Sequence, residues 1–250
     1  MKSLLFIFAR VVFSSVDPDA VIDFTERGET VPRGVTKVHG KRYTLTGTER
    51  VYYARQAQVE GIAPRIAMPH PLACVLSRLA SGVYLMNRAD TASAPEGRIV
   101  FKTGDVRQFV EWQLAPDEQV IFHFKDFIAA DKSVEFSTLV SFRIPTLLMG
   151  RFLYRVATGP GRLILRTDGA AETVDQTDAM LSKPVYRVVA WHRGAQFKLE
   201  AEQTFADIYL SSVHVKMTPG DMVVFVAEAG DRRRVGTGAV RFLKNFVLPI

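Results

Sequence analysis

Hydrophobic and polar residues alternate along much of the second half of this chain. In the clearest run, Val110, Trp112 and Leu114 share one parity, and Glu111 and Gln113 share the other. A period of two places successive side chains on opposite faces of an extended strand, whereas a surface helix repeats its hydrophobic residues every three to four positions. Similar short runs follow at intervals of roughly ten residues, separated by turn-forming residues. We therefore predict an all-β protein, an antiparallel β-sandwich or a barrel-like fold with few short helices.

Two proline turns punctuate these runs, Leu114-Ala-Pro-Asp-Glu118 and Thr158-Gly-Pro-Gly-Arg162. In the second turn, proline presets φ at the first central position, and the following glycine accepts the positive φ that a type II turn requires. This chemistry predicts a tight turn between two neighbouring strands. Short helices are expected over residues 72–79 and 170–181, and residues 240–247 fit either a strand or a helix.

The domain organisation has two open interpretations. Residues Asp90 to Gly97, rich in Ala, Ser and Pro, are the best candidate for a linker. This predicts an N-terminal β region over residues 1–95 and a β-sandwich region over residues 96–250, with one continuous domain over residues 1–250 as the alternative. The segments 114–122 and 217–225 also align with each other without gaps. This similarity has two explanations, either the turn residues common to many hairpins or a pair of similar β modules.

Charge and cysteine content limit the environment of the chain. The net charge of +6 permits binding to nucleic acid or an anionic membrane surface, although most basic residues are interspersed singly. The single cysteine, Cys74, rules out an internal disulfide and fits a reducing compartment, so we expect a cytoplasmic location. Arg10 interrupts the apolar run near the N-terminus, which favours a buried first strand over a signal peptide.

Residue patterns typical of catalysis are missing from the sequence. There is no His-x-His pair, no helix-borne His-Glu-x-x-His motif, no Gly-x-Ser-x-Gly elbow and no phosphate-binding loop, so no cofactor is expected. His123, His192 and His214 lie on predicted strands and are the candidate ligands if a metal site exists. A small-ligand or metal-binding β-barrel enzyme is therefore the alternative to a non-catalytic protein.

Residues 110–167 resemble the altered-inheritance-of-mitochondria 24 family, whose fold is similar to that of the tryptophan RNA-binding attenuator protein. The likeness is carried by the turn at residues 114–118, by Phe127-Ile-Ala-Ala-Asp-Lys-Ser-Val134, by Gly150-Arg-Phe, and by Gly159-Pro-Gly followed by a strand ending at Thr167. It extends loosely to residue 90. The resemblance implies a compact β fold that assembles into symmetric oligomers, and it supplies no catalytic residues. About ninety residues before it and eighty after it depart from the pattern.

Four arginines flank the Gly-Pro-Gly turn on its two predicted strands. Strand surfaces bind single-stranded nucleic acid by combining basic residues with stacking rings. The possible basic binding face consists of Arg151, Arg155, Arg162 and Arg166. Taken together, the sequence predicts a non-catalytic β scaffold or binding protein that forms a homo-oligomer, with nucleic-acid or membrane-surface binding as further alternatives.

Overall fold

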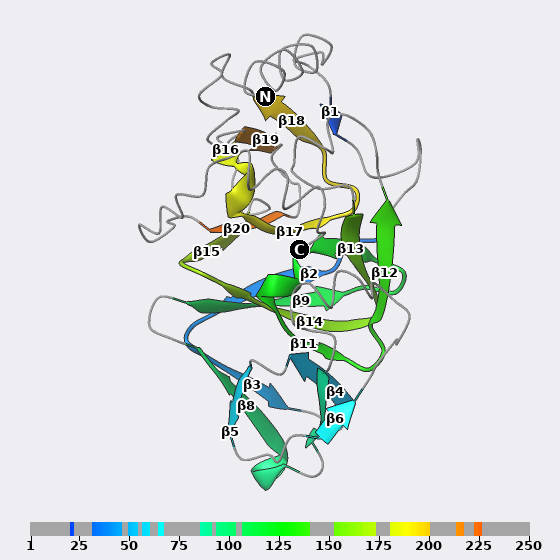
Figure 1. The fold of residues 1–250 in the computed structure, drawn as a ribbon, viewed down its shortest axis with the longest axis vertical. Helices are drawn as coiled ribbons and strands as arrows, with labels where there is room; N and C mark the ends of the chain where they lie inside the picture. Colours follow the sequence, from blue (N-terminus) through cyan, green and yellow to red (C-terminus); the bar gives the residue numbers. More distant parts are fainter. Residues whose placement is uncertain are drawn as a thin grey trace, which may run out of the picture.

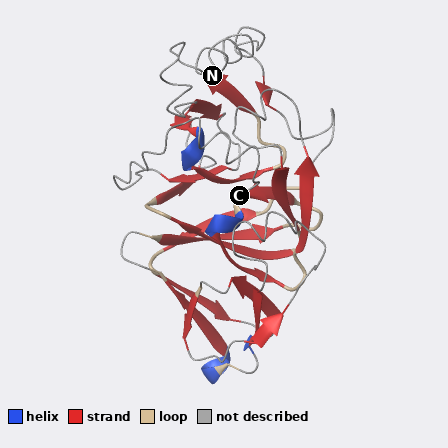
Figure 2. Ribbon diagram, in the orientation of Figure 1, coloured by secondary structure: helices blue, strands red, loops and turns tan. Residues whose placement is uncertain are grey.

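The computed structural model describes about half of the chain, and every regular element in that part is a β-strand or a short 3-10 turn (Figures 1 and 2). The described residues are 21–22, 32–46, 50–54, 57–60, 65–67, 86–91, 94–103, 107–140, 153–173, 181–200, 214–217 and 223–226. The prediction of an all-β fold is confirmed, and the strands form several open sheets. No helix in these ranges is long and apolar enough to span a bilayer.

The larger inner sheet has seven strands and packs against an outer sheet of three. Its strands, in spatial order, are β2 (Val35–His39), β9 (Gln108–Leu114), β14 (Gly161–Thr167), β11 (Phe127–Asp131), β4 (Arg50–Ala54), β7 (Met86–Asp90) and β6 (Arg65–Ala67). The outer sheet contains β3 (Arg42–Thr46), β8 (Arg98–Lys102) and β5 (Gln58–Glu60).

A second inner sheet of six strands packs against an outer sheet of four. The inner sheet contains β12 (Glu135–Val140), β13 (Leu153–Thr158), β10 (Gln119–Phe122), β17 (Val188–His192), β20 (Val223–Val226) and β15 (Ala171–Thr173). The outer sheet contains β1 (Val21–Ile22), β18 (Phe197–Glu200), β19 (His214–Met217) and β16 (Leu181–Pro184). Three 3-10 turns complete the described elements, η2 (Pro95–Gly97), η3 (Phe124–Asp126) and η5 (Val185–Arg187).

Three hydrophobic cores separate the four layers, which follow one another along the long axis of the molecule in Figure 1. Trp112 and Phe122 lie in the central core between the two inner sheets. Phe101 belongs to the core under the three-stranded sheet, and Trp191 belongs to the core under the four-stranded sheet. The inner strands are thus covered on both faces, which explains why every residue of β11 and β17 is buried.

The predicted alternation of β9 is confirmed, because Val110, Trp112 and Leu114 all face the central core. The helix expected over residues 170–181 is wrong at both ends. Residues 171–173 form β15, which pairs with β20, and residue 181 begins β16. Pairing with distant strands overrides a local helical pattern in such short segments. Residues 174–180, residues 240–247 and the other expected helix, residues 72–79, lie outside the described residues.

The Gly-Pro-Gly segment joins two sheets instead of closing a hairpin between neighbouring strands. Strand β13 pairs with β10 and β12 in the six-stranded sheet, whereas β14 pairs with β9 and β11 in the seven-stranded sheet. The Gly159-Pro160 peptide is cis, and Gly161 has a φ of 139°. A Cβ at Gly159 would collide with the carbonyl oxygen of Ala115, so this segment packs closely on the preceding proline turn.

Strands from both sides of residue 95 share sheets. The seven-stranded sheet combines β2, β4, β6 and β7 with β9, β11 and β14, and β8 pairs with both β3 and β5. The two segments of the sequence echo occupy different kinds of connection. The first leads from β9 to β10, between the two inner sheets, and the second leads from β19 to β20, from an outer sheet to an inner one.

Candidate functional site

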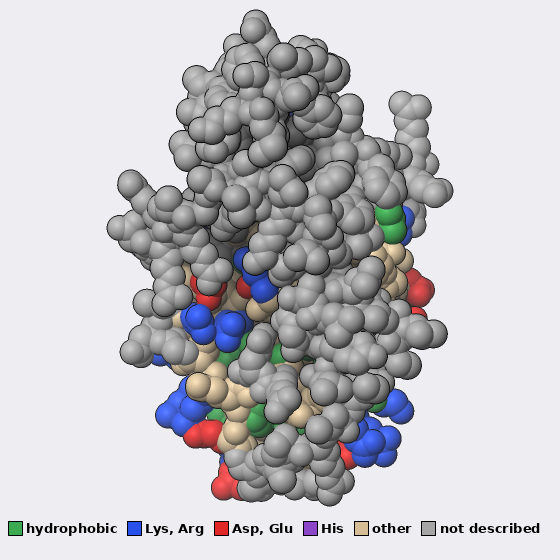
Figure 3. Space-filling view, viewed as in Figure 1, with side chains coloured by type: hydrophobic (Ala, Val, Ile, Leu, Met, Phe, Trp, Pro, Cys, Tyr) green, Lys and Arg blue, Asp and Glu red, His purple; other side chains and the backbone are tan. Residues whose placement is uncertain are grey.

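The four arginines of the predicted basic face do not share one surface. Arg155 on β13 is only 1% exposed, so its expected place on an exposed face is wrong. Arg162 and Arg166 lie on β14 in the other inner sheet, and Arg151 lies outside the described residues. The prediction treated β13 and β14 as neighbours, and their separation into two sheets removes the shared face. On the side of the molecule drawn in Figure 3, basic side chains lie singly or in small groups interspersed with acidic ones.

Arg162 has a structural partner in the buried carboxylate of Asp131 on β11. The Arg162 side chain donates from Nε to Oδ2 at 2.9 Å and from Nη2 to Oδ1 at 3.2 Å, and its backbone N–H donates to Oδ2 at 2.8 Å. Nη1 also donates to the carbonyl oxygen of Thr46. A two-pronged pair of this kind fixes both groups. Arg162 therefore ties β14 to β11 and to the end of β3.

The proline turn at residues 114–118 is held by the buried side chain of Glu118. One carboxylate oxygen accepts the indole N–H of Trp112 at 3.0 Å, and the other accepts the backbone N–H of Ala115 at 2.7 Å. The backbone carbonyl of Glu118 also accepts the N–H of Gly159. These contacts give the acidic residue of the turn a structural role.

The three candidate metal ligands do not gather in one place. His192 is buried on β17, where Nδ1 accepts the backbone N–H of Gly194 at 3.0 Å and Nε2 donates to the carbonyl oxygen of Pro32 at 2.7 Å. Both ring nitrogens are therefore occupied. His123 packs edge-on against Trp191, and His214 lies on β19 in the outer sheet. Within the described ranges, no group of three His, Cys, Asp or Glu side chains could hold a metal ion.

A polar network links the first strands of the seven-stranded and three-stranded sheets. His39 Nε2 lies 3.0 Å from Glu111 Oε2, and the buried phenol of Tyr43 also interacts with Glu111. Burial and then the Glu111 charge raise the pKa of Tyr43 above its ordinary value, while Arg162 opposes this shift. A phenol with a raised pKa stays neutral at physiological pH, so this network favours a structural role.

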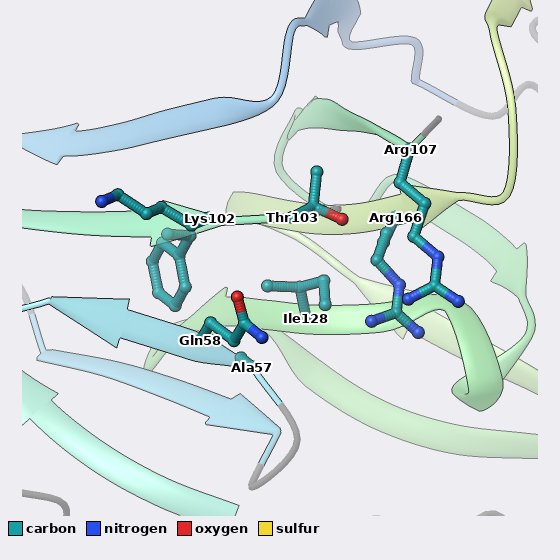
Figure 4. A pocket seen from close by; sticks show the side chains of 8 residues that line it. Ala57, Gln58, Lys102, Thr103, Arg107, Ile128 and Arg166 are labelled. Carbon is teal, nitrogen blue, oxygen red and sulfur yellow. The ribbon is translucent and has the colours of Figure 1, made fainter. Parts of the chain in front are cut away.

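Arg166 lines a basic pocket (Figure 4). The pocket lies between the edge of the three-stranded sheet and strand β14. The cavity volume is about 130 Å³. Its lining residues come from the four strands β5, β8, β11 and β14 and from positions that flank β5, β8 and β9: Ala57, Gln58, Phe101, Lys102, Thr103, Arg107, Ile128 and Arg166. Figure 4 shows the guanidinium groups of Arg107 and Arg166 side by side, whereas the Lys102 ammonium points away from them. We refer to this cavity as the basic pocket.

The charges of the basic pocket are only partly neutralised. Arg107 Nε lies 3.0 Å from the exposed Asp168, and Lys102 pairs with Glu60. Arg166 has no ion pair or hydrogen bond within the described ranges. Burial, and then the neighbouring charge of Arg107, lower the pKa of Arg166 from its ordinary value. Two positive groups are thus held together in a partly desolvated place.

Sequence reasoning identified only one member of the basic pocket. Arg166 was predicted to bind because of its place beside the Gly-Pro-Gly turn, whereas Thr103 and Arg107 belong to a connection between β8 and β9 that carries no recognised motif. Arginines spread along the sequence indicate a basic surface without locating a site. The packing of the outer sheet on β14 is what brings Arg107 and Arg166 together.

Comparisons with known proteins found matches among solved structures only. No family model matches this sequence. A search of curated proteins also found no match. Among solved structures, the chain is similar to the X-ray crystal structure of protein SPYM3_0169 from Streptococcus pyogenes, at 14% sequence identity and a TM-score of 0.49, covering 78% of this chain and 94% of that chain. This likeness assigns no activity or partner, and the proposals below rest on the residues of this chain.

Proposed function

We propose that this chain is a non-catalytic β scaffold with a binding role, which assembles with copies of itself. The observation that carries this proposal is the outer edge of the seven-stranded sheet. Among the described strands, β2 has a single hydrogen-bonded neighbour, β9, and it exposes Val35 by 56% and Val38 by 42%. An edge strand with exposed β-branched residues is a template for pairing with another chain.

The conspicuous polar residues support a scaffold over an enzyme. Glu118, Asp131 and His192 are buried and hold turns or strands together through the contacts described above. The lining of the basic pocket offers cations, an amide and a hydroxyl, without an adjacent nucleophile and base. Such a set of groups is suited to holding a ligand.

The resemblance to the altered-inheritance-of-mitochondria 24 family is part of the same proposal. It implies a β fold that assembles into symmetric oligomers, in agreement with self-association through β2. A cytoplasmic location is proposed on the single cysteine of the chain.

Light scattering coupled to size-exclusion chromatography tests the assembly over a wide range of protein concentration. We expect a discrete oligomer for the wild-type chain and a shift to monomer in the double variant Val35→Glu, Val38→Glu, because two carboxylates would be desolvated at the contact. Val140→Glu is the matched control, since Val140 is 52% exposed on β12 at the edge of the other inner sheet. A wild-type monomer at every concentration, or loss of the oligomer only in the control, would contradict the proposal.

The enzyme alternative has a separate test. Metal analysis of the untagged protein should find less than one equivalent of any transition metal per chain. One equivalent that disappears in His123→Ala or His214→Ala would overturn the non-catalytic assignment and would favour a metal-binding site.

A further inference from the structure

Within the described part of the chain, one positive charge of the basic pocket, that of Arg166, has no ion-pair partner. Lys102 is paired with Glu60, and Arg107 is paired with Asp168. Arg166 is half-buried, yet no described side chain forms an ion pair or a hydrogen bond with it. Guanidinium groups in such places are normally paired, because removing a charge from water is costly. The described residues therefore place no carboxylate in contact with Arg166, although the charges of Asp168 and Asp126 act on it from a distance.

The two arginines of β14 have different surroundings. Arg162, Ile164 and Arg166 share one parity, so all three point toward the outer three-stranded sheet. At one end of this row, Arg162 is fixed by three hydrogen bonds to Asp131. At the other end, Arg166 lines the pocket beside Arg107. Arg162 thus binds a carboxylate of the protein itself, whereas Arg166 faces an open cavity.

Thr103 provides a second, independent sign of a ligand. Its hydroxyl oxygen is buried and has no hydrogen-bond partner within the described ranges. Buried polar atoms nearly always have a partner, so an unsatisfied one calls for a bound water, ion or ligand. Figure 4 shows this hydroxyl on the side of the pocket where the Arg107 and Arg166 guanidinium groups lie. The orphan hydroxyl and the excess charge therefore face the same space.

The size of the cavity limits the ligand to a small group. Its volume of about 130 Å³ equals roughly four water molecules at about 30 Å³ each. Pockets for whole cofactors or drug-sized molecules are several times larger, at about 300–1,000 Å³. A tetrahedral oxyanion fits this space, whereas a whole nucleotide is too large for it.

We propose that the basic pocket binds a phosphate group, either free phosphate or the terminal group of a small phosphate monoester. The Arg107 and Arg166 guanidinium groups would donate to its oxygens in the planar, two-pronged manner that phosphate geometry favours, and the Thr103 hydroxyl would donate to a third oxygen. Two guanidinium groups match a phosphate monoester, which carries a charge of about −1.5 to −2 at neutral pH, better than a singly charged phosphodiester or carboxylate. Asp168 is exposed and forms an ion pair with Arg107 alone, although its charge also acts on Arg166.

Isothermal titration calorimetry on the full chain tests this site at low salt and pH 7.5. We expect saturable binding of inorganic phosphate, one per chain, and at least about tenfold weaker binding of acetate because a carboxylate carries less charge and fewer oxygens. Glycerol phosphate distinguishes the sources: equal affinity assigns the site to free phosphate, and tighter binding assigns it to a monoester. Failure of both phosphates to bind, or equal binding of acetate, would overturn the proposal.

Matched variants locate the binding. Arg166→Gln should weaken phosphate binding by about tenfold or more, and Thr103→Val should weaken it by about threefold, because each removes a donor. Arg98→Gln is the control, since it removes the same charge from the far end of β8, where Arg98 pairs with the exposed Glu96. Unchanged affinity in Arg166→Gln, or an equal loss in the control, would contradict the assigned residues.

A measurement on the wild-type chain does not depend on the folding of any variant. Phenylglyoxal modifies arginine side chains, and peptide mapping should show that phosphate slows its reaction at Arg107 and Arg166 but leaves Arg98 unchanged. A uniform effect on all three arginines would contradict the site. Tighter binding of a single-stranded oligonucleotide than of either phosphate compound, with a steep salt dependence, would overturn the small-ligand assignment in favour of nucleic acid. Light scattering on the same samples reports self-assembly separately, so the two proposals can fail independently.

Discussion

The indole N–H of Trp112 donates to the carboxylate of Glu118 at 3.0 Å inside the protein, next to the central core. The same carboxylate accepts the backbone N–H of Ala115 and so closes the proline turn that follows β9. The turn therefore connects the seven-stranded sheet to the six-stranded sheet, and the Glu118 carboxylate provides hydrogen-bond partners for its buried polar groups.

Replacing Glu118 by Gln tests this relationship. An amide has one acceptor oxygen in place of two, so either Trp112 or Ala115 would lose its partner. We expect the free energy of unfolding to fall by about 2 kcal/mol, measured by urea denaturation. Asp117→Asn is the neighbouring control, because Asp117 is exposed with a φ of 61° that asparagine tolerates, and it should change stability by less than about 0.5 kcal/mol. Equal effects of the two substitutions would assign the loss to the charge of the turn.

Gly34 approaches the same region from the segment that precedes β2. A Cβ there would collide with the carbonyl oxygen of Gln113 and with the Glu118 carboxylate, whereas a Cβ at Gly40, beyond the other end of β2, would meet no atom within 4 Å. Gly34→Ala should therefore lower the thermal midpoint through a loss of about 3 kcal/mol, and Gly40→Ala should change it little. A stable Gly34→Ala protein would mean that β2 can move away from β9 at low cost.

The sequence predicted strand positions well and sheet membership poorly. Alternation identified the buried face of β9, because Val110, Trp112 and Leu114 obey the two-residue period of any strand. The same period says nothing about which sheet a strand joins. For this reason we expected β13 and β14, which are separated by one turn, to be neighbours in one sheet. The structure instead places them in different sheets.

The basic pocket was beyond sequence reasoning for a related cause. Gln58, Thr103 and Arg166 are separated by more than forty residues in each case, and they meet only because β5 and β8 form an outer sheet over β14. Single arginines are common on strands and often have structural roles. Arg155 is buried in the fold, and Arg162 forms an ion pair with Asp131. Composition predicted excess positive charge, and only the packing of the layers shows where that charge lacks a partner.

The pair formed by Asp131 and Arg162 should contribute strongly to stability. Asp131 is 3% exposed and accepts three hydrogen bonds from one residue. Asp131→Asn removes the carboxylate that binds the Arg162 guanidinium, and we expect a loss of about 3 kcal/mol in urea unfolding, near the lower end for a buried pair because Arg162 is 18% exposed. Glu96→Gln breaks the exposed pair with Arg98 and should cost less than about 1 kcal/mol. Similar losses in both variants would contradict the structural weight assigned to Asp131.

Tyr43 makes the stability of the protein sensitive to alkaline pH. Burial and the Glu111 charge raise its pKa in the folded state, whereas the phenol of the unfolded chain titrates near its ordinary value of 10.0. A raised folded-state pKa means that the folded protein holds this proton more tightly, so the resulting stability is complete below pH 10 and is lost as the pH rises above it. The wild-type free energy of unfolding should therefore fall by about 1 kcal/mol between pH 9.5 and pH 11 from this group alone.

Tyr43→Phe removes the titrating group and should flatten that alkaline decline. At neutral pH the variant should be less stable by about 1 kcal/mol, because the interaction with Glu111 is lost. Tyr52→Phe, on β4, the next strand along the chain, is the control and should keep the wild-type slope. Urea unfolding curves at pH 8, 9.5 and 11 compare the three proteins. Parallel declines in the wild type and Tyr43→Phe would show that the alkaline sensitivity arises elsewhere, and that Tyr43 does not hold its proton more tightly in the folded state.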